Sequence, residues 1–319
     1  MDTPLAEVAT EAAVPAPAPR AAAWRRLLRN WSVRIGGALL LLLTLLSVLA
    51  PWLGTVDPTL IDPVNRDLLP GSRAAVVTLT GESFEHRFWM GSDSYGRDIY
   101  SRVLYGGRVS LVVGIAVALL SLFFGLIVGL TAGFLRRLDA VVMRVMDGLM
   151  AIPGILLAIA LVALWRPSLP TVILAITVPE IPRVVRLTRA LVLSIREEPY
   201  VEAAVSVGTS TFRLLYRHVL PNTVAPLIVQ GTYICAFAIL VEAILSFLGV
   251  GLSTDVPTWG NIMAEGRLQF TQYPHNVLFA GVFLALTVLA VNILGDGLRD
   301  TLDPRFSRES SNYGRGDRP

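Results

Sequence analysis

Long apolar runs separated by polar segments dominate the pattern of hydrophobic and polar positions in this chain. Six runs stand out: Ile35–Leu53, Val109–Leu135, Gly148–Trp165, Ser168–Val178, Thr223–Gly251 and Val277–Gly295. All but the fourth have about 18 residues or more, enough for a helix to cross the hydrocarbon core of a bilayer. The fourth is shorter and interrupted by Pro179 and Pro182, and we expect it to continue through Val184 and Val185. The pattern predicts an all-α polytopic membrane protein with six transmembrane helices.

The first run, residues 35–53, has two interpretations. Val48-Leu49-Ala50 resembles the site at which a secretory signal peptide is cleaved. Pro51 would then follow the cut, where signal peptidases generally reject proline, and the region before the run is unusually long. We therefore interpret this run as a retained transmembrane helix.

Composition agrees with a membrane protein. Of 319 residues, 54% are hydrophobic and 16% are charged, and the mean hydropathy is +0.62. In soluble domains about a quarter of the residues are charged, so this chain has fewer charges than a soluble domain. All 27 basic residues are arginine, so the chain has no P-loop lysine and no lysine that could form a Schiff base. If ATP drives this protein, another chain must bind it.

The sequence does not indicate metal or nucleic-acid binding. Cys235 is the single cysteine and lies in an apolar run, so we expect a buried apolar residue there. His86, His218 and His275 are far apart and lack the spacing of metal ligands. The net charge is only +3. We expect no cofactor and no metal on this chain, and no nucleic-acid partner.

The distribution of arginine predicts how the chain crosses the membrane. With the N-terminus in the cytoplasm, 19 arginines, including Arg183 and those after it in the same loop, lie inside and eight lie outside, in keeping with the positive-inside rule. Both termini are then cytoplasmic. The predicted parts are a disordered, Ala- and Pro-rich tail with a basic flank over 1–34, a first helix over 35–53, an extracytoplasmic segment over 54–108, a core of five helices over 109–296, and a tail over 297–319.

The extracytoplasmic segment holds two local predictions. Its apolar stretch Ala74–Leu79 is predicted to form a strand. Two acid–base pairs follow at i, i+4 spacing, Asp93 with Arg97 and Asp98 with Arg102. We expect both pairs to form salt bridges along an interfacial helix.

The loop over residues 186–222 is the strongest candidate for a functional site because it is the one long cytoplasmic loop. Pro199 suits the first turn of a helix, and Glu202 then lies near the positive end of the helix. Gly208 can end that helix, and a hydroxyl residue after it can cap the next.

The second helix of this loop carries Phe212, Leu215 and Val219, an apolar stripe at i, i+3, i+7 spacing, and Pro221 is expected to end it. The loop is thus predicted to form an amphipathic helical knob. Periodicity alone fits a solvated connector with an interfacial helix equally well.

The spacing within the loop resembles a family signature. The chain reads Glu-Ala-Ala, three residues, Gly, nine residues and His-x-Leu-Pro, at Glu202, Ala203, Ala204, Gly208, His218, Leu220 and Pro221. This closely resembles the signature loop of bacterial ABC-importer permeases, which presents a coupling helix to a groove in the ATPase subunit. The resemblance implies the type I importer permease fold and assigns these residues to ATPase coupling.

Other segments resemble the C-type permease of the dipeptide, oligopeptide and nickel group. They are Met90–Arg102, Tyr105–Leu111, Leu245–Gly251, Pro257–Asn261 and Asp300–Arg305, and the resemblance covers roughly residues 30–306. The N-terminal tail and the long loop 58–88 depart from it or lie outside it. It implies a bacterial inner-membrane importer in which this non-catalytic chain pairs with a second, homologous permease, two ATPase subunits that bind ATP and Mg, and an extracytoplasmic solute-binding protein.

Two features inside the apolar runs have open interpretations. Glu242 lies in the fifth run, where an acid is costly unless it faces protein or water; it is either part of a translocation path or a structural acid held between helices. Gly125, Gly129 and Gly133 lie on one face of the second run and predict close packing, either within the chain or against a partner permease.

Short peptides are the expected cargo, with nickel or a nickel chelate as the alternative. The runs contain no intramembrane histidine, and Cys235 stands alone, which disfavours a metal cage. Two functions from other classes compete: a proton-coupled secondary transporter that uses Glu242, and a membrane enzyme, for which the sequence offers no convergent set of catalytic groups.

Overall fold

The computed structural model describes residues 27–78 and 81–302. The predicted tails therefore lie mostly outside the described residues. The helices are α2 (Trp31–Val48), α3 (Ile99–Phe134), α4 (Arg136–Met150), α5 (Gly154–Leu164), α6 (Leu169–Arg196), α7 (Pro199–Ser206), α8 (Thr211–Leu214), α9 (Leu220–Phe247), α10 (Trp259–Gly266) and α11 (His275–Leu302), with short turns η1 (Ala50–Trp52), η2 (Pro63–Asn65), η3 (Leu215–Val219) and η4 (Arg267–Gln269). The strands β1 (Ser72–Val77) and β2 (Ser83–Phe88) pair antiparallel, with Ser72 opposite Phe88.

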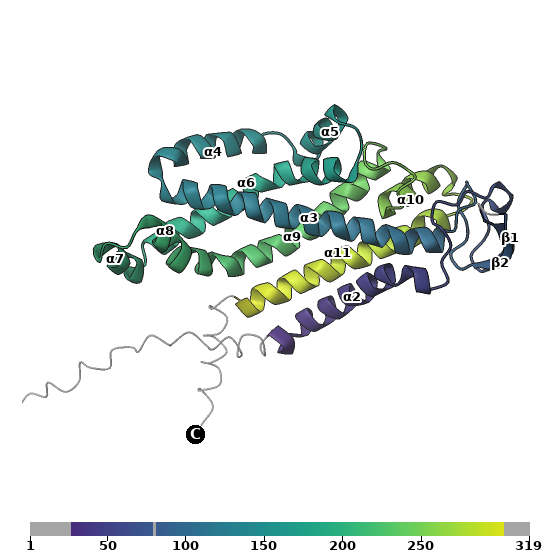
Figure 1. The fold of residues 1–319 in the computed structure, drawn as a ribbon, viewed down its shortest axis with the longest axis horizontal. Helices are drawn as coiled ribbons and strands as arrows, with labels where there is room; N and C mark the ends of the chain where they lie inside the picture. The colour runs from purple at the N-terminus through teal and green to yellow at the C-terminus, as the bar shows by residue number, and fades with distance from the viewer. Residues whose placement is uncertain (1–26, 79–80, 303–319) are drawn as a thin grey trace, which may run out of the picture.

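Long helices running side by side make an elongated bundle (Figure 1). Helix α3 packs against α6 and α9, and α2 packs against α11. The strands and α10 lie at one end, here called the hairpin end, and α7 and α8 lie at the other, here called the knob end. The main core is formed by apolar side chains of α3, α5, α6 and α9, among them Val113, Val117, Ala158, Val162, Val172, Ile176, Ile234 and Ala238.

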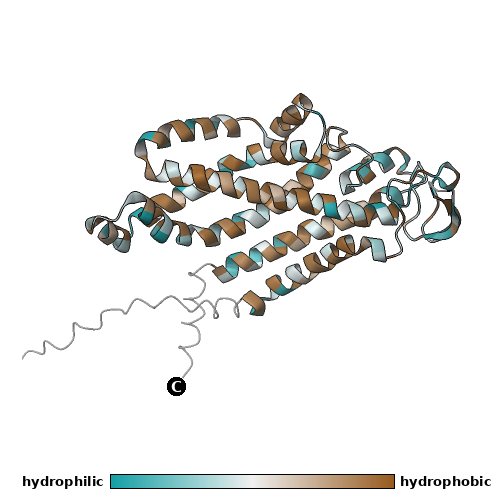
Figure 2. Cartoon of the chain, in the orientation of Figure 1, coloured by the Kyte–Doolittle hydropathy of each residue, from teal (hydrophilic) through white to brown (hydrophobic). Residues whose placement is uncertain are grey.

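Apolar residues cover the middle of the bundle, and hydrophilic residues gather at its two ends (Figure 2). Helices α2, α3 and α11, and α9 continued from α8, are long and apolar enough to cross a membrane, and α4 with α5 adds a fifth span if the bent pair counts as one. Helix α6 has 28 residues and is long enough to cross a membrane. However, three charged residues lie together in its middle, Glu180, Arg183 and Arg186, and they lower its hydropathy. The six predicted runs fall on α2, α3, α5, α6, α9 and α11, but α6 is not among the helices apolar enough to cross a membrane. The described residues thus hold four or five candidate spans where six were predicted.

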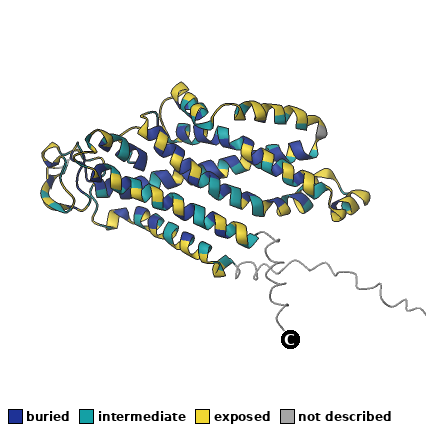
Figure 3. Ribbon diagram, turned by 180° about the vertical axis from the view of Figure 1, so that it is seen from behind, coloured by how far each residue is buried: buried dark blue, intermediate teal, exposed yellow. Residues whose placement is uncertain are grey.

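The third predicted span was wrong as a single helix. The run 148–165 divides at Pro153, which precedes the 11-residue helix α5. The segment between the second and third predicted runs, together with the start of the third run, forms α4, which meets α5 at 86°. The reason is that proline has no N–H to donate and its ring clashes with the preceding helical turn. The outward side of α4 is exposed (Figure 3).

The fourth span also differs from its prediction. Pro179 and Pro182 lie inside α6 without interrupting it, and the helix continues to Arg196. The candidate loop therefore begins at Glu197 rather than at residue 186. Arg183, counted among the cytoplasmic arginines, lies in the middle of a long helix.

Helix α3 is longer than its apolar run. It begins at Ile99, ten residues before the predicted start at Val109, and Asp98 caps it by accepting a hydrogen bond from the Ser101 N–H at 2.9 Å. The strand predicted over Ala74–Leu79 is confirmed over residues 74–77, which belong to β1, whereas Leu79 lies outside the described residues.

A buried charge network fixes the hairpin end. Arg97 Nε lies 2.7 Å from Asp93 Oδ2, which confirms the first predicted pair, although Asp93 lies in a turn and not on a helix. The second prediction was wrong: Arg102 pairs with Glu265 of α10 through Nη2 and Oε2 at 3.1 Å, and Arg97 Nη2 reaches the same oxygen at 2.5 Å. The network joins the segment before α3, which contains Asp93 and Arg97, to α3 and α10.

Candidate functional site

The knob consists of residues 197–219, at the end of the bundle where α6 leads into α9 (Figure 1). Helix α7 begins with Pro199 and carries Glu202 in its first turn, as predicted. Proline is preset for this position, and the carboxylate lies next to the free N–H groups of the helix start.

Gly208 makes the sharp turn that ends α7. Its φ is +76°, a conformation that only glycine adopts without strain. The Thr209 N–H donates to the Ala204 carbonyl at 3.1 Å, and the Gly208 N–H donates to the Val205 carbonyl at 2.9 Å. These two bonds form a Schellman motif. No atom lies within 4 Å of the position that a Cβ at Gly208 would occupy, so the glycine is needed for its backbone angle and not for space.

Buried apolar side chains anchor the knob to the bundle. Val201, Leu214 and Val219 are almost completely buried. The Asn222 amide donates to the Tyr200 hydroxyl oxygen at 3.1 Å and to the His218 carbonyl at 2.7 Å. Burial raises the pKa of Tyr200, as does the nearby charge of Glu198. The knob is held at both of its ends.

Other apolar side chains of the knob face outward. Val205, Val207, Phe212 and Tyr216 are exposed, Val207 to 82% and Phe212 to 79%. An exposed apolar group rimmed by polar residues is typical of a protein-interaction site. The knob thus presents a small apolar surface on a rigid support.

The predicted stripe of Phe212, Leu215 and Val219 was wrong. Phe212 points outward, whereas Val219 is buried. Residues 215–219 form a turn of π-helix, which takes more residues per turn than an α-helix and so rotates the later side chains away from the expected face. Pro221 does not end this helix: it lies in the first turn of α9.

The structure gathers the predicted loop residues in two places. Glu202, Ala203, Ala204 and Gly208 lie on α7 and its terminal turn, and His218, Leu220 and Pro221 lie at the junction with α9. Glu202 and Ala203 are exposed. Both groups belong to the knob end, beside the outward apolar side chains.

Glu242 is enclosed between helices. Its side chain is completely buried, accepting a hydrogen bond from the Ser246 hydroxyl at 2.8 Å and one from the Ser110 hydroxyl of α3 at 3.3 Å. This geometry suits a polar contact that joins α9 to α3. A role in the translocation path stays a hypothesis.

The three glycines of α3 pack against α6 of the same chain. A Cβ built at Gly129 would lie 2.5 Å from the Thr188 Cβ, and one at Gly133 would lie 2.8 Å from the Val192 Cβ. Gly125 faces Val184 in the same way. The interface that the sequence left open is therefore within the subunit.

Sequence reasoning missed Glu180. This carboxylate is buried in α6, 3.2 Å from the guanidinium of Arg183. An acid between two prolines, near the end of a short apolar run, was the available signal. Within the described part of the chain, no group of three or more His, Cys, Asp or Glu side chains could hold a metal ion.

The comparisons with known proteins agree with the family resemblance of the loop sequence. The family model described as "Binding-protein-dependent transport system inner membrane component" matches residues 121–308, which include the whole knob. A second model, "N-terminal TM domain of oligopeptide transport permease C", matches residues 19–70. This chain belongs to the family of binding-protein-dependent transport permeases.

Curated relatives align with this permease over most of its length. A putative peptide transport system permease protein of Brucella abortus biovar 1 is 46% identical over 89% of this chain and 92% of its own. The dipeptide transport system permease protein DppC of Alkalihalophilus pseudofirmus is 39% identical over 89% of each chain. The glutathione transport system permease protein GsiD of Pectobacterium atrosepticum is 38% identical over 89% of this chain and 90% of its own. The resemblance to the dipeptide and oligopeptide group is confirmed.

Among solved structures, the permease is similar to a chain of the MetNI methionine ABC transporter in an inward facing form. The identity is 19%, the TM-score is 0.45, and the match covers 60% of this chain and 94% of that one.

Proposed function

We propose that this permease is the C-type membrane subunit of an ATP-driven importer for short peptides. It forms half of a translocation path with a second, homologous permease and takes cargo from an extracytoplasmic solute-binding protein. Two partner ATPase subunits bind ATP and Mg; the permease does not hydrolyse ATP itself. It lies in the bacterial inner membrane with both termini and the knob in the cytoplasm.

The knob carries this proposal. It is anchored by buried Val201, Leu214 and Val219, and it turns Phe212 and Val207 outward. A rigid projection of this kind can transmit the displacement of a docked partner to the helices α6 and α9 that flank it, which is how a coupled motor selects one of two packings. Peptide cargo is supported by the relatives named as peptide and dipeptide permeases.

Other functions are less well supported. The proton-coupled alternative relies on Glu242, which is enclosed by hydrogen-bonding partners. The nickel alternative would be supported by a set of metal ligands on this chain. The described residues contain no group of three or more His, Cys, Asp or Glu side chains that could hold a metal ion.

Gentle affinity purification of this permease from its native membranes tests the proposal. An ATPase, a second permease and a solute-binding protein should co-purify, and the ligand on that binding protein distinguishes peptide from nickel. A chain that repeatedly purifies alone in mild detergent would contradict the proposal.

Two matched variants sharpen the test. Phe212→Asp places a charge on the knob, and Leu268→Asp places one on a residue that is 87% exposed at the hairpin end. We expect Phe212→Asp to lose the ATPase but keep the second permease, because only the knob contacts the ATPase. Leu268→Asp should keep both. Equal retention of the ATPase by the two variants would contradict the role of the knob.

A further inference from the structure

One side of α9 is only partly covered by the rest of the chain. Its residues recur every three or four positions and so share one face: Pro226, Gln230, Tyr233, Phe237, Leu240, Ile244 and Phe247. The four nearest the hairpin end are between 36% and 41% exposed. We call this set the open face.

Arginines from three other segments reach the open face. The guanidinium of Arg267 lies 5.4 Å from the ring of Phe247, and that of Arg183, from α6, lies 5.1 Å from the ring of Phe237. Arg299, from α11, lines the same cavity as Tyr233, whose hydroxyl donates to the Asp296 carboxylate of α11 at 2.6 Å. Arg183 and Arg267 thus rest on aromatic rings of α9, an arrangement that holds a guanidinium in place without removing its charge.

Arg183 lies at the depth of the bilayer centre. Phe237, on which it rests, is the middle of the apolar run 223–251, with 14 residues on either side. The neighbouring Val184 packs against Gly125 of α3, which is close to the middle of the run 109–135. The positions of Arg183 relative to α9 and relative to α3 therefore place it at the same depth.

A charged group at that depth cannot face lipid without a large cost. Half of the Arg183 side chain is nevertheless exposed, and its partner Glu180 is buried behind it. The open face must therefore meet water or another polar surface in the working assembly.

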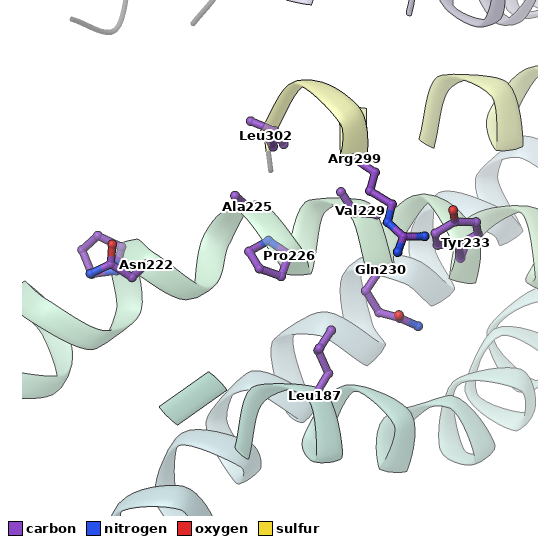
Figure 4. A pocket seen from close by; sticks show the side chains of 10 residues that line it. Leu187, Asn222, Ala225, Pro226, Val229, Gln230, Tyr233, Arg299 and Leu302 are labelled. Atoms are coloured by element: carbon purple, nitrogen blue, oxygen red, sulfur yellow. The ribbon is translucent and has the colours of Figure 1, made fainter. Parts of the chain in front are cut away.

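A cavity continues the open face toward the knob end. It has a volume of about 610 Å³ and is lined by Gln230, Tyr233, Arg299 and, one turn from Arg183, Leu187. Figure 4 shows Arg299 extending from α11 toward Tyr233 and Gln230. Ligand cavities for small molecules have about 300–1,000 Å³, so a short peptide fits this volume.

We propose that the open face is a wall of the translocation path, and that Arg183 binds the carboxylate of the cargo halfway across the membrane. This inference rests on the proposed function. Glu180 occupies one amino group of the guanidinium, through Nη1, and leaves other N–H donors for a cargo carboxylate. Arg299 then offers the next guanidinium along the cavity. Competition with Glu180 keeps the contact weak enough for the cargo to leave.

Accessibility tests the path without any cargo. In a Cys235→Ser background this chain has no cysteine, and Arg183→Cys, Leu268→Cys and Leu119→Cys then introduce one each. The assembled importer is treated with a charged, membrane-impermeant methanethiosulfonate, and labelling of this chain is read by mass. We expect Arg183→Cys to react as Leu268→Cys does, and the apolar α3 position Leu119→Cys to stay unlabelled. Failure of Arg183→Cys to react would show that lipid or the partner permease covers the open face, and would overturn the path.

Uptake tests the carboxylate contact. The assembled importer in proteoliposomes, with its binding protein, is given a dipeptide that the wild type imports. Arg183→Gln should lower uptake about tenfold, the usual effect of losing one charge-assisted contact, while Arg183→Lys retains part of it. Arg186→Gln is the matched control, because Arg186 lies one turn away on α6 and pairs with Asp147 of α4 at 2.6 Å.

A double variant separates cargo binding from a structural role. Glu180→Gln with Arg183→Gln removes both charges, so no buried acid is left unpaired. If Arg183 binds cargo, uptake stays low in the double variant; recovery to the wild-type rate would overturn the inference. A wild type that imports no peptide would instead overturn the proposed function, and the labelling result would still decide whether the open face lines a path.

Discussion

Gly208 illustrates how a single residue fixes the shape of the knob. The sequence indicated a glycine that ends a helix, and the structure shows why: φ is +76° and two backbone hydrogen bonds close the turn. A side chain there meets open space. The constraint is therefore on the backbone, and different substitutions should have different effects.

Replacing Gly208 by valine should uncouple ATP hydrolysis from uptake. A β-branched residue at positive φ is strained by about 1–3 kcal/mol, so the turn opens and the outward side chains of the knob change direction. Asparagine tolerates this conformation better, so Gly208→Asn is the matched control. Hydrolysis and peptide uptake are measured on the same reconstituted importer. Unchanged uptake in Gly208→Val would remove Gly208 from the coupling role.

Glu242 should tolerate an isosteric neutral replacement. Gln at this position can still bond the Ser110 and Ser246 hydroxyls, so Glu242→Gln should keep uptake and thermal stability. Glu242→Leu leaves those buried hydroxyls without their partner, at a cost of about 1–3 kcal/mol. Thermal unfolding in detergent and uptake with the proton gradient collapsed are the measurements. Loss of uptake in Glu242→Gln would favour proton coupling.

At the scale of elements, the contact between α3 and α6 decides the packing of the bundle. Gly125, Gly129 and Gly133 bring the α3 backbone against Val184, Thr188 and Val192, which are spaced four apart on α6. The sequence showed the small-residue face but not its partner, because any helix with a complementary ridge could occupy it.

Gly129→Val should loosen this contact. Its Cβ would meet Thr188 at 2.5 Å and the Val185 carbonyl at 3.0 Å, and the backbone atom cannot move aside. Overpacking of this kind typically costs about 1–3 kcal/mol. The purified permease should unfold at a lower temperature in detergent.

Gly148 provides the control for this prediction, because no atom lies within 4 Å of a Cβ built there. Gly148→Ala, in an open helical position, should keep or slightly raise the unfolding temperature. Equal unfolding temperatures for Gly129→Val and the wild type would mean that α3 and α6 pack differently.

At the scale of the whole molecule, the charge network at the hairpin end ties together parts that are distant in sequence. Glu265 of α10 contacts Arg97 and Arg102, which lie 168 and 163 residues earlier in the sequence. Arg102 also donates to the Pro58 carbonyl at 3.2 Å. The segment 54–98 is thereby held on the ends of α3 and α10.

Glu265→Gln should release this segment. It leaves two buried guanidiniums with less compensating charge, and breaking a buried pair in this way costs about 3–5 kcal/mol. Limited proteolysis of the intact permease should then cut residues 54–98 faster. Glu82→Gln, at an exposed position, is the control and should be cut at the wild-type rate. Equal protection of both variants would show that the network does not hold the segment.

The sequence by itself determined the class of the protein. Apolar runs of sufficient length specify spanning helices because backbone groups must be satisfied internally in lipid, and the Glu-Ala-Ala loop placed the knob and its glycine turn. These are local properties: composition, periodicity and a backbone angle. The third and fourth runs were the exception, because whether a proline breaks a helix depends on what packs around it: Pro153 separates α4 from α5, while Pro179 and Pro182 are held inside α6.

Only the tertiary structure decided which groups meet. It paired Arg102 with Glu265, turned Phe212 outward and Val219 inward, enclosed Glu242, and set Arg183 on Phe237 in the middle of the bundle. Each of these contacts joins residues from different elements, or depends on a turn that shifts the helical register. The sequence lists such groups but does not contain their distances, because packing of the whole chain sets them.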